Sequence, residues 1–413
     1  MTWRAQWRAL RGPMLMVVLP AALSVVLTAC RDGARRRDVS DPSAIVVAPA
    51  RPRAGAGALD VTDTTPDGEH ESRLEIALDY QRLCVRSEGR VRCTSSPTPD
   101  VSLAAAPALE GIDDAVSLSI TGAFGCVATR AGKVLCFGDN TYGQLGAHLR
   151  ADRSDKPVVV SGVANAKRVL TSAAHACAIL RDETVRCWGG NDSGQTGGST
   201  YYLPAARELV EADAVERVSD VAALAVGRST TCAATRGRNV TCWGRALFDE
   251  GRAMHAMNGP TNVRPGAVAD LAGFEDIAAS DGSFCGIVRG EVKCWGELWS
   301  LFSGEKARGS KIATTGVTGA SKVKVTASHA CALLADGTVT CWGNGSYGAL
   351  GRGEVGDTSE ALAPETVRGL TSVVDIATGG AASCAVTGAR EVYCWGTWPA
   401  TDGSMHKLSL IHI

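Results

Sequence analysis

Cysteines occur in seven close pairs that recur along most of this 413-residue chain, and they constrain its fold more than any other feature. Eight or nine residues separate the two cysteines of a pair, and successive pairs begin 42 to 55 residues apart. A long period repeated seven times is typical of a stacked or radial repeat protein and not of one irregular core. The pairs are Cys84 and Cys93, Cys126 and Cys136, Cys177 and Cys187, Cys232 and Cys242, Cys285 and Cys294, Cys331 and Cys341, and Cys384 and Cys394.

The spacing inside each pair predicts a β-hairpin in which the two cysteines face each other. If Cys331 faces Cys341, the loop is residues 335–337, and its last residue is a glycine, which suits the positive φ that such a loop needs. The two shorter pairs leave the two-residue loops 88–89 and 289–290, which also end in glycine. Three of the longer loops lack glycine in the last position, and we expect a different turn geometry there.

Facing cysteines on antiparallel strands lie close enough to bond, best at a non-hydrogen-bonded pair. Seven disulfides are therefore predicted, and they indicate an oxidising compartment. Buried free thiols are an alternative interpretation. Zinc would favour about two to four residues between its cysteines, and no pair has that spacing, so we predict no metal site.

The first 29 residues are predicted to be a signal peptide. Arginines precede an apolar stretch, residues 14–26, that is short for a membrane span. The stretch leads into Leu27-Thr28-Ala29-Cys30, which resembles the lipobox of bacterial lipoproteins. In that family the signal is cut before the cysteine, which is then acylated, so Cys30 is the predicted lipid attachment site. A plain secretion signal and an uncleaved anchor are the alternatives. Residues 30–71 are predicted to be a disordered membrane-proximal linker.

Each hairpin is preceded by a short segment with the composition of a strand. The segments are Leu74–Leu78, Val116–Ile120, Arg168–Thr171, Ala223–Val226, Asp276–Ala279, Val323–Thr326 and Val374–Ala377. Segments such as 158–160 and 365–367 follow a proline and add a further strand. Three or four short strands in each of seven repeats predict an all-β fold, a seven-bladed β-propeller with short antiparallel blades, over residues 72–413.

A recurring aromatic position follows the second cysteine of each pair. Five repeats contain Cys-Trp-Gly, and we expect the tryptophans to fill the space between neighbouring blades, with a ligand platform as the alternative. They are Trp188, Trp243, Trp295, Trp342 and Trp395, and Thr94 and Phe137 take their place in the first two repeats. Three repeats continue into a glycine-rich turn, at residues 140–146, 191–197 and 345–351.

The combined pattern H-x-C-A-L-x-x-D-G-x-V-x-C-W-G-x-N-x-x-G-x-L-G resembles the regulator of chromosome condensation repeat, in a cysteine-paired bacterial form. The match is strongest at His329–Gly351 and His175–Gly197. The resemblance implies a seven-bladed propeller closed by pairing of the two chain ends. We therefore expect the strand-like segment Leu408–Ile411 to complete the ring against Leu74–Leu78, with a frayed tail as the alternative.

The sequence contains no recognisable motif of catalysis, neither a glycine-rich phosphate loop nor G-x-S-x-G nor H-E-x-x-H. His175 and His329 precede cysteines at equivalent positions, and we expect both to be structural and to bond local backbone. A net charge of −1 gives no reason to expect a nucleic-acid partner. We predict that the protein is not an enzyme and uses no cofactor.

The most variable segments follow the Trp-Gly dipeptides, where aromatic residues suit recognition of a partner. The candidate binding residues are Tyr201, Tyr202, Trp299 and Phe302, which alternatively pack on a neighbouring blade.

We predict a lipoprotein of the bacterial cell envelope, at the outer membrane or cell surface. It is held in the membrane by an N-terminal lipid, and its rigid propeller binds a protein or polysaccharide. An extracellular propeller hydrolase or lyase is the alternative function. Nucleotide exchange on a small GTPase, which the eukaryotic members of the family perform, is disfavoured by the signal peptide and the disulfides.

Overall fold

The computed structural model describes residues 74–80, 82–94, 106–198, 212–245, 248–249, 252–253, 263–298, 300–303, 312–352, 360–399 and 405–412. The chain divides into two units, Met1–Val61 and Thr62–Ile413, and every described residue belongs to the second. The predicted signal peptide, Cys30 and the predicted linker lie outside the described residues. No described helix is long and apolar enough to cross a membrane.

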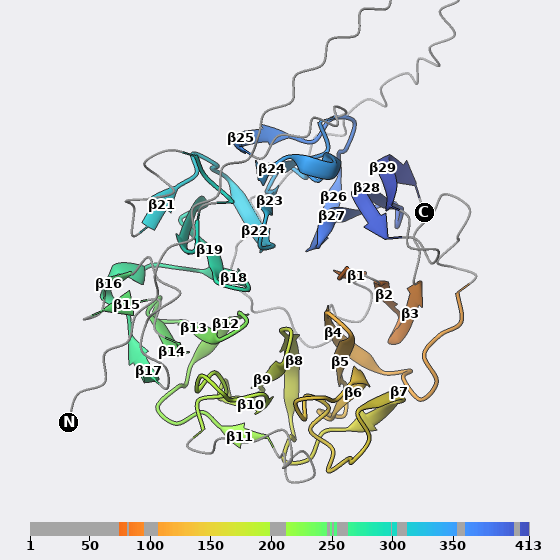
Figure 1. Cartoon of the computed structure of the whole chain (residues 1–413), viewed down its shortest axis with the longest axis vertical. Coiled ribbons are helices and arrows are strands. Elements are labelled where there is room, and N and C mark those ends of the chain that lie inside the picture. The colour runs from red at the N-terminus through yellow and green to blue at the C-terminus, as the bar shows by residue number, and fades with distance from the viewer. Residues whose placement is uncertain are drawn as a thin grey trace, which may run out of the picture. The chain divides into compact units, whose positions relative to one another are not determined.

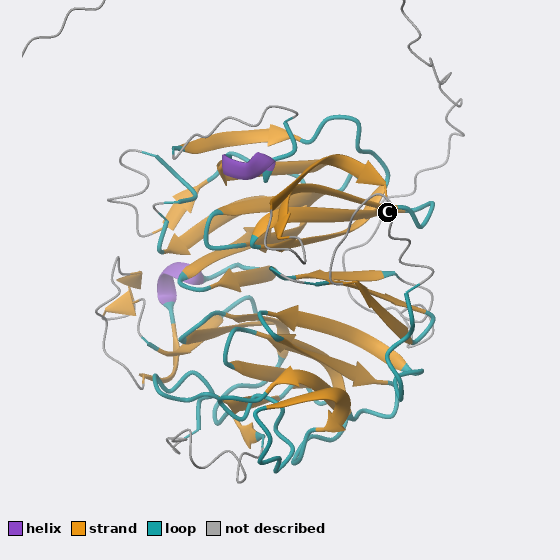
Figure 2. Ribbon diagram, turned by 45° about the vertical axis from the view of Figure 1, so that its right-hand side comes forward, coloured by secondary structure: helices purple, strands orange, loops and turns teal. Residues whose placement is uncertain are grey.

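The described chain forms seven antiparallel sheets arranged as blades around one axis, which confirms the predicted all-β propeller (Figure 1). Strands make up nearly all of its regular structure (Figure 2). The first strand of each blade lies innermost, and these seven strands adjoin one another around the axis.

Blade 1 consists of β1 (Glu75–Leu78), β2 (Leu83–Ser87) and β3 (Arg90–Thr94), and blade 2 of β4 (Ala115–Thr121), β5 (Phe124–Thr129), β6 (Val134–Asp139) and β7 (Arg153–Val159). Blade 3 consists of β8 (Ala166–Thr171), β9 (His175–Leu180), β10 (Val185–Gly189) and β11 (Asp213–Ala214). Blade 4 consists of β12 (Val221–Val226), β13 (Thr230–Thr235), β14 (Val240–Gly244) and β17 (Val263–Ala267).

Blade 5 consists of β18 (Asp276–Ser280), β19 (Ser283–Val288), β20 (Glu291–Gly296) and β21 (Ile312–Thr314). Blade 6 consists of β22 (Ala320–Val325), β23 (His329–Leu334), β24 (Val339–Asn344) and β25 (Ala361–Thr366). Blade 7 consists of β26 (Val373–Gly379), β27 (Ala381–Thr387), β28 (Val392–Pro399) and β29 (Met405–His412). The connections contain the pair β15 (Phe248–Asp249) and β16 (Arg252–Ala253) and the short helices η2 (Ala269–Leu271) and η3 (Ser346–Gly348).

All seven cysteine pairs are disulfide-bonded, as predicted, and each bond joins the second and third strands of one blade. In blade order the bonds join Cys84 to Cys93, Cys126 to Cys136, Cys177 to Cys187, Cys232 to Cys242, Cys285 to Cys294, Cys331 to Cys341, and Cys384 to Cys394. The alternative of buried free thiols is therefore wrong for every pair.

The disulfides lie at the predicted register of the hairpins. In blade 6, Cys331 faces Cys341 and Leu333 faces Val339. The two Cα atoms of each bonded pair are 4.0 to 4.1 Å apart, which is the close approach of a non-hydrogen-bonded pair. In the chain-entropy model each bond contributes roughly 2–3 kcal/mol, because it closes a loop of about ten residues.

The five longer hairpins share one turn geometry, with positive φ at the last loop residue. The glycine loops have φ of 77° at Gly132 and 80° at Gly337. The three loops without glycine there have φ of 63° at Glu183, 61° at Arg238 and 68° at Arg390. Our expectation of a different geometry for these three is therefore wrong, because non-glycine residues adopt the left-handed conformation at a cost of about 1–2 kcal/mol.

Contacts with the following blade accompany this strained conformation. Glu183 forms an ion pair with Arg236 of blade 4 (2.5 Å), and Arg238 pairs with Glu275 of blade 5 (3.1 Å). Arg390 of blade 7 pairs with Glu88 of blade 1 (3.2 Å). The arginine of each pair is exposed, so each pair contributes at most about 1 kcal/mol and offsets part of the strain.

The hydrophobic core lies between the blades. Each of the seven clusters of buried apolar side chains combines residues of two adjacent blades, and together they cover all seven junctions. The five repeated tryptophans are at most 1 % exposed, which confirms that they fill the space between blades. In blade 5, Trp295 stacks on Phe284 with ring centroids 5.5 Å apart.

Within the described residues, the ring closes by packing of blade 7 on blade 1, and the C-terminal strand does not pair with β1. Leu408–Ile411 forms part of β29, which pairs with β28 as the fourth strand of blade 7. The expectation that this segment meets Leu74–Leu78 is therefore wrong, and so is the alternative of a frayed tail. Pairing with β28 needs only a short connection, whereas pairing with β1 would close a loop through the whole ring. Instead, Ile76 and Leu78 share a buried cluster with residues of blade 7.

Candidate functional site

The connections of the propeller emerge at two opposite ends of the blades, because adjacent strands are antiparallel. Turns between first and second strands lie at the same end as connections between third and fourth strands. We call this end the loop face. The disulfide-bonded hairpin turns lie at the other end.

The glycine-rich turns of the loop face bind the tryptophan of the following blade. In blades 2, 3 and 6 the turn presents a backbone carbonyl to the next indole N–H. The bonds, each 2.9 Å, run from Trp188 Nε1 to Gln144 O, from Trp243 Nε1 to Gln195 O, and from Trp395 Nε1 to Ala349 O. The last glycine of the turn is needed for this contact, because a Cβ on Gly146 would lie 2.7 Å from Trp188 Cδ1.

The hydrogen bond of each repeated tryptophan depends on whether the preceding blade has this turn. Blades 4 and 5 lack it, and the buried Nε1 atoms of Trp295 and Trp342 in blades 5 and 6 have no hydrogen-bond partner among the described residues. Blade 1 also lacks it, and blade 2 carries Phe137, which has no N–H to satisfy. The glycine-rich turn therefore caps the indole of the following blade, which means that its backbone carbonyl accepts the hydrogen bond of the indole N–H.

Trp188→Phe is expected to lower the free energy of unfolding by about 1–2 kcal/mol more than the matched variant Trp295→Phe. The first removes a hydrogen bond and leaves the Gln144 carbonyl unpaired, whereas the second removes an N–H that has no partner among the described residues. Urea unfolding followed by circular dichroism measures both. Equal losses in the two variants would show that the cap contributes nothing.

The structure buries one of the four candidate binding residues and does not describe the other three. Phe302 is 8 % exposed and packs with Leu298 and Leu301 in the cluster between blades 5 and 6, so its side chain fills the core. This is the alternative placement considered for it, and it removes Phe302 as a contact residue. Tyr201, Tyr202 and Trp299 lie outside the described residues.

Three exposed tyrosines on the loop face were not predicted as binding residues. Tyr80 (63 % exposed) lies in the turn between β1 and β2, and Tyr142 (49 %) and Tyr347 (52 %) lie in glycine turns after third strands. Tyr347 also has a φ of 64°. The signal was present in the sequence, because Tyr142 and Tyr347 occupy the same place in two glycine turns.

Around the axis, the first strand of each blade places one side chain at an equivalent position. In each first strand, one residue pairs with the first cysteine of the blade, and the residue at the equivalent position precedes it by two. We call the set the inner ring, and its members in blade order are Glu75, Ser117, Arg168, Ala223, Asp276, Lys322 and Asp375.

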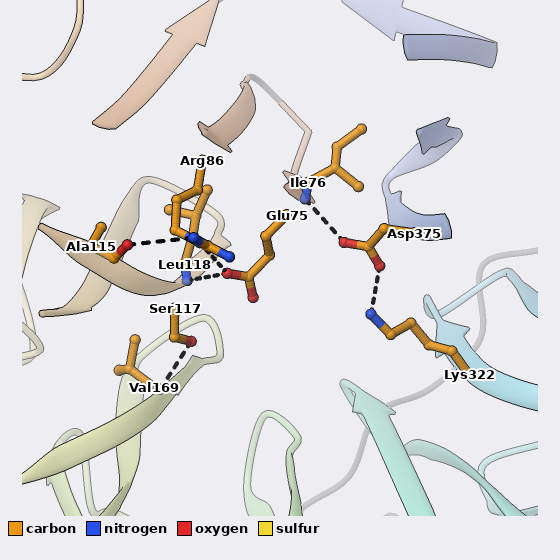
Figure 3. Close-up of polar contacts among 9 residues, drawn as sticks. All are labelled: Glu75, Ile76, Arg86, Ala115, Ser117, Leu118, Val169, Lys322 and Asp375. Atoms are coloured by element: carbon orange, nitrogen blue, oxygen red, sulfur yellow. Dashed lines mark hydrogen bonds and ion pairs between the residues drawn. The ribbon is translucent and has the colours of Figure 1, made fainter. Parts of the chain in front are cut away.

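At three junctions the inner-ring side chain accepts a hydrogen bond from the next blade's backbone (Figure 3). The bonds run from Leu118 N to Glu75 Oε2 (2.9 Å), from Val169 N to Ser117 Oγ (3.3 Å), and from Ile76 N to Asp375 Oδ2 (3.2 Å). The junction between blades 7 and 1, which closes the ring, therefore has the same kind of hydrogen bond as the junctions between blades 1 and 2 and between blades 2 and 3.

Two of the inner-ring carboxylates are also ion-paired. Glu75 pairs with Arg86 (3.0 Å), and Asp375, which is almost fully buried, pairs with Lys322 (2.5 Å). Burial raises the pKa of Asp375, but Lys322, Lys324 and the hydrogen bonds to the carboxylate outweigh this and hold the pKa below its ordinary value. Asp375 is therefore a charged group at neutral pH.

His175 and His329 are fully buried at equivalent positions, as expected of structural residues, but they bond hydroxyls and not backbone. Nδ1 of His175 bonds Ser172 Oγ (2.8 Å), and its Nε2 bonds Thr231 Oγ1 of the next blade (3.0 Å). His329 bonds Thr326 Oγ1 and, in the next blade, Ser383 Oγ in the same way (3.0 and 2.8 Å). Burial lowers the pKa of His175 to about 3 and that of His329 to about 4.

Within the described residues, no group of three or more His, Cys, Asp or Glu side chains has an arrangement that would hold a metal ion. His175 and His329, whose pKa values are lowered by burial, are fully buried and bonded to hydroxyls.

Comparison with known proteins identifies the repeat. A sequence profile for the regulator of chromosome condensation (RCC1) repeat matches residues 115–144, 171–195 and 320–349, and a second profile for the repeat matches residues 336–386. The E3 ubiquitin-protein ligase HERC2 of Homo sapiens is 29 % identical over 287 residues, which are 65 % of this chain and 6 % of that protein. The regulator of chromosome condensation of Drosophila melanogaster is 26 % identical over 309 residues, 70 % of this chain and 55 % of that protein.

A solved structure shares the fold. Prp20p from Saccharomyces cerevisiae superposes with a TM-score of 0.60 at 16 % identity, over 76 % of this chain and 82 % of that chain. The chain thus spans only a small part of HERC2 but most of the propeller structure it resembles. The profile matches show regulator of chromosome condensation repeats at residues 115–144, 171–195 and 320–386, in a chain that folds as a seven-bladed β-propeller.

Proposed function

We propose that this protein is an exported, membrane-anchored lipoprotein whose propeller binds a protein or polysaccharide partner through its loop face. One observation carries the proposal. Of the five large apolar or aromatic side chains that are exposed in the described chain, the three tyrosines all stand on the loop face. Exposed aromatic residues are enriched where proteins recognise partners, because they supply contact area at low entropic cost.

The backbone at Tyr347 supports this interpretation. Glycine would adopt its φ of 64° without strain, whereas tyrosine adopts it at a cost of about 1–2 kcal/mol. The conformation is held by the neighbouring blade, because Thr397 Oγ1 donates a hydrogen bond to Tyr347 O (2.8 Å). A strained and exposed aromatic residue on a rigid support is typical of a functional contact.

The comparisons and the disulfides fit a binding role outside the cytoplasm. The work on Prp20p describes its binding properties to Gsp1p and histones, so a propeller of this fold serves protein binding there. Seven disulfides favour an oxidising compartment for this chain. We therefore place the partner on the outer side of the inner membrane and not in the cytoplasm.

Replacement of Tyr80, Tyr142 and Tyr347 by alanine is expected to weaken binding about tenfold or more. The measurement is biolayer interferometry of the full-length protein against two defined sets of ligands, purified envelope polysaccharides and a displayed peptide library. Lys133→Ala is the control, because Lys133 is exposed on a hairpin turn at the opposite end of blade 2. Unchanged binding by the triple variant to every ligand that the wild type binds would contradict a role for the loop face.

Cys30→Ala is expected to abolish incorporation of a labelled fatty acid and to release the protein from the membrane fraction. The reason is that the lipobox cysteine carries the acyl chains that anchor such a protein. Labelling of wild type and variant in a bacterial host, followed by fractionation, measures both effects. Retention of label or of membrane attachment in the variant would exclude lipid anchoring at Cys30.

A further inference from the structure

Two cations near the axis of the propeller have no partner in the described protein. Arg168 of blade 3 belongs to the inner ring, and Lys324 of blade 6 stands in the next layer, facing Cys331. Neither makes a hydrogen bond or an ion pair with any residue that the structure describes. Both side chains are only partly buried, so an ion from solvent can reach them.

The layer of Lys324 contains no other charge. Its equivalents, each facing the first cysteine of a blade, are Ala77, Ser119, Leu170, Ala225, Ala278 and Ala377. Lys324 is thus the one long polar side chain of a layer made mostly of small residues. Its charged neighbours come from the inner ring.

The charges around Lys324 do not balance. Glu75 is paired with Arg86 and Asp375 with Lys322, so two of the inner-ring carboxylates are already neutralised. Arg168, Lys324 and the carboxylate of Asp276 have no ion pair among the described residues, which leaves one positive charge in excess. Like charges in a partly buried position repel each other more strongly than in bulk water.

The electrostatic environment of Lys324 agrees with this arrangement. Burial lowers the pKa of its ammonium group, Lys322 and Arg168 lower it further, and Asp375 and Asp276 act in the opposite direction. Groups from blades 3, 5, 6 and 7 therefore act on one ammonium group. A bound anion would relieve the repulsion between the cations.

We propose that Lys324 and Arg168 form an anion-binding site at the axis of the propeller, suited to the oxyanion group of a phosphate or a carboxylate. A guanidinium group offers a planar fork of donors that matches either oxyanion, and an ammonium group adds a point charge. The site is separate from the tyrosines of the loop face, and it does not depend on the proposed function. Asp276 opposes the anion and limits its affinity.

The test is isothermal titration of the full-length protein at constant low ionic strength, with inorganic phosphate in one series and acetate in another. Saturable binding of one anion per protein is expected, and the series that binds distinguishes phosphate from carboxylate. Lys324→Gln and Arg168→Gln are each expected to weaken binding about tenfold or more. Asp276→Asn is expected to strengthen it, and Lys133→Gln, at an exposed hairpin turn, to leave it unchanged.

A purely structural role for Lys324 predicts a different thermal behaviour. Under our proposal Lys324→Gln unfolds, without added anion, at the same temperature as the wild type or higher, because one of two repelling charges is gone. The added anion then raises the unfolding temperature of the wild type and not of the variant. No saturable binding of either anion by the wild type would overturn the site. Equal binding by the wild type and both glutamine variants, or loss of binding in Lys133→Gln, would overturn it as well.

Discussion

Asp375→Ala is expected to lower the free energy of unfolding by about 3 kcal/mol, because it breaks a partly buried ion pair and leaves a backbone N–H unpaired. The side chain of Asp375 is 4 % exposed and lies 2.5 Å from Lys322. It also accepts the hydrogen bond from Ile76 N that joins the last blade to the first. The variant therefore leaves a charge without its partner and an N–H unpaired at the junction that closes the ring.

Ser117→Ala is the matched control, because it removes the same bond between blades at an ordinary junction and leaves no charge behind. Its expected cost is about 1 kcal/mol. Urea unfolding of both variants at pH 7.5 gives the comparison. If Asp375→Ala costs no more than Ser117→Ala, the carboxylate at the closing junction acts only as a neutral acceptor.

Acidification from pH 6.5 to 4.5 is expected to lower the free energy of unfolding by about 4 kcal/mol through His175 and His329 alone. In the unfolded chain both imidazoles titrate near 6.5, whereas in the fold their pKa values are about 3 and about 4. At pH values between the folded and the unfolded pKa, the unfolded chain binds more protons than the folded chain. The contribution of the two histidines to the free energy of unfolding is therefore present above pH 6.5 and is lost as the pH falls. Each histidine contributes about 1.4 kcal/mol per pH unit.

Burial keeps these rings neutral in the folded protein, and the hydrogen bonds of His175 fit one neutral tautomer. Thr231 Oγ1 donates to Gln195 O (2.9 Å) and therefore accepts from the Nε2–H of His175. The remaining nitrogen, Nδ1, accepts from Ser172. Protonation of Nδ1 would break that bond at a ring whose full burial already disfavours the charged form.

The pH effect is measured by urea unfolding at pH 7.5 and at pH 4.5. The double variant, His175→Gln with His329→Gln, is expected to be less stable at pH 7.5 but to lose much less stability on acidification. Parallel curves for wild type and double variant would show that other groups cause the acid sensitivity.

Local features of the fold could be predicted from the sequence, because they depend on residues close together in the chain. The facing cysteines follow from loop length alone, and the register of Cys331 on Cys341 confirms this. The tryptophan position was interpreted correctly as core, since one buried aromatic per blade is a packing requirement.

Long-range contacts could not be predicted in this way. The bond from Ile76 N to Asp375 joins residues 299 positions apart, and no local pattern marks either one. The turns at Glu183 and Arg390 adopt a conformation that their own residue types disfavour, with ion pairs to the neighbouring blade offsetting part of the strain. Phe302 shows the same limit, because an apolar cluster in a connection is compatible with a core and with a binding surface.

The anion site and the tyrosines of the loop face were missed for different reasons. Arg168 and Lys324 are 156 positions apart in the sequence, and only the strand registers show that both belong to first strands around one axis. Tyr142 and Tyr347 were visible as a repeated residue, but exposure alone distinguishes them from structural members of the glycine turn.

The disulfides of the hairpins also determine how the protein responds to proteolysis. A protease that cuts one of the seven turns severs the backbone between two cysteines that remain covalently joined. The two fragments stay together, and the nicked blade keeps its register. A protein built in this way tolerates cleavage at every one of these turns without losing a piece of its chain.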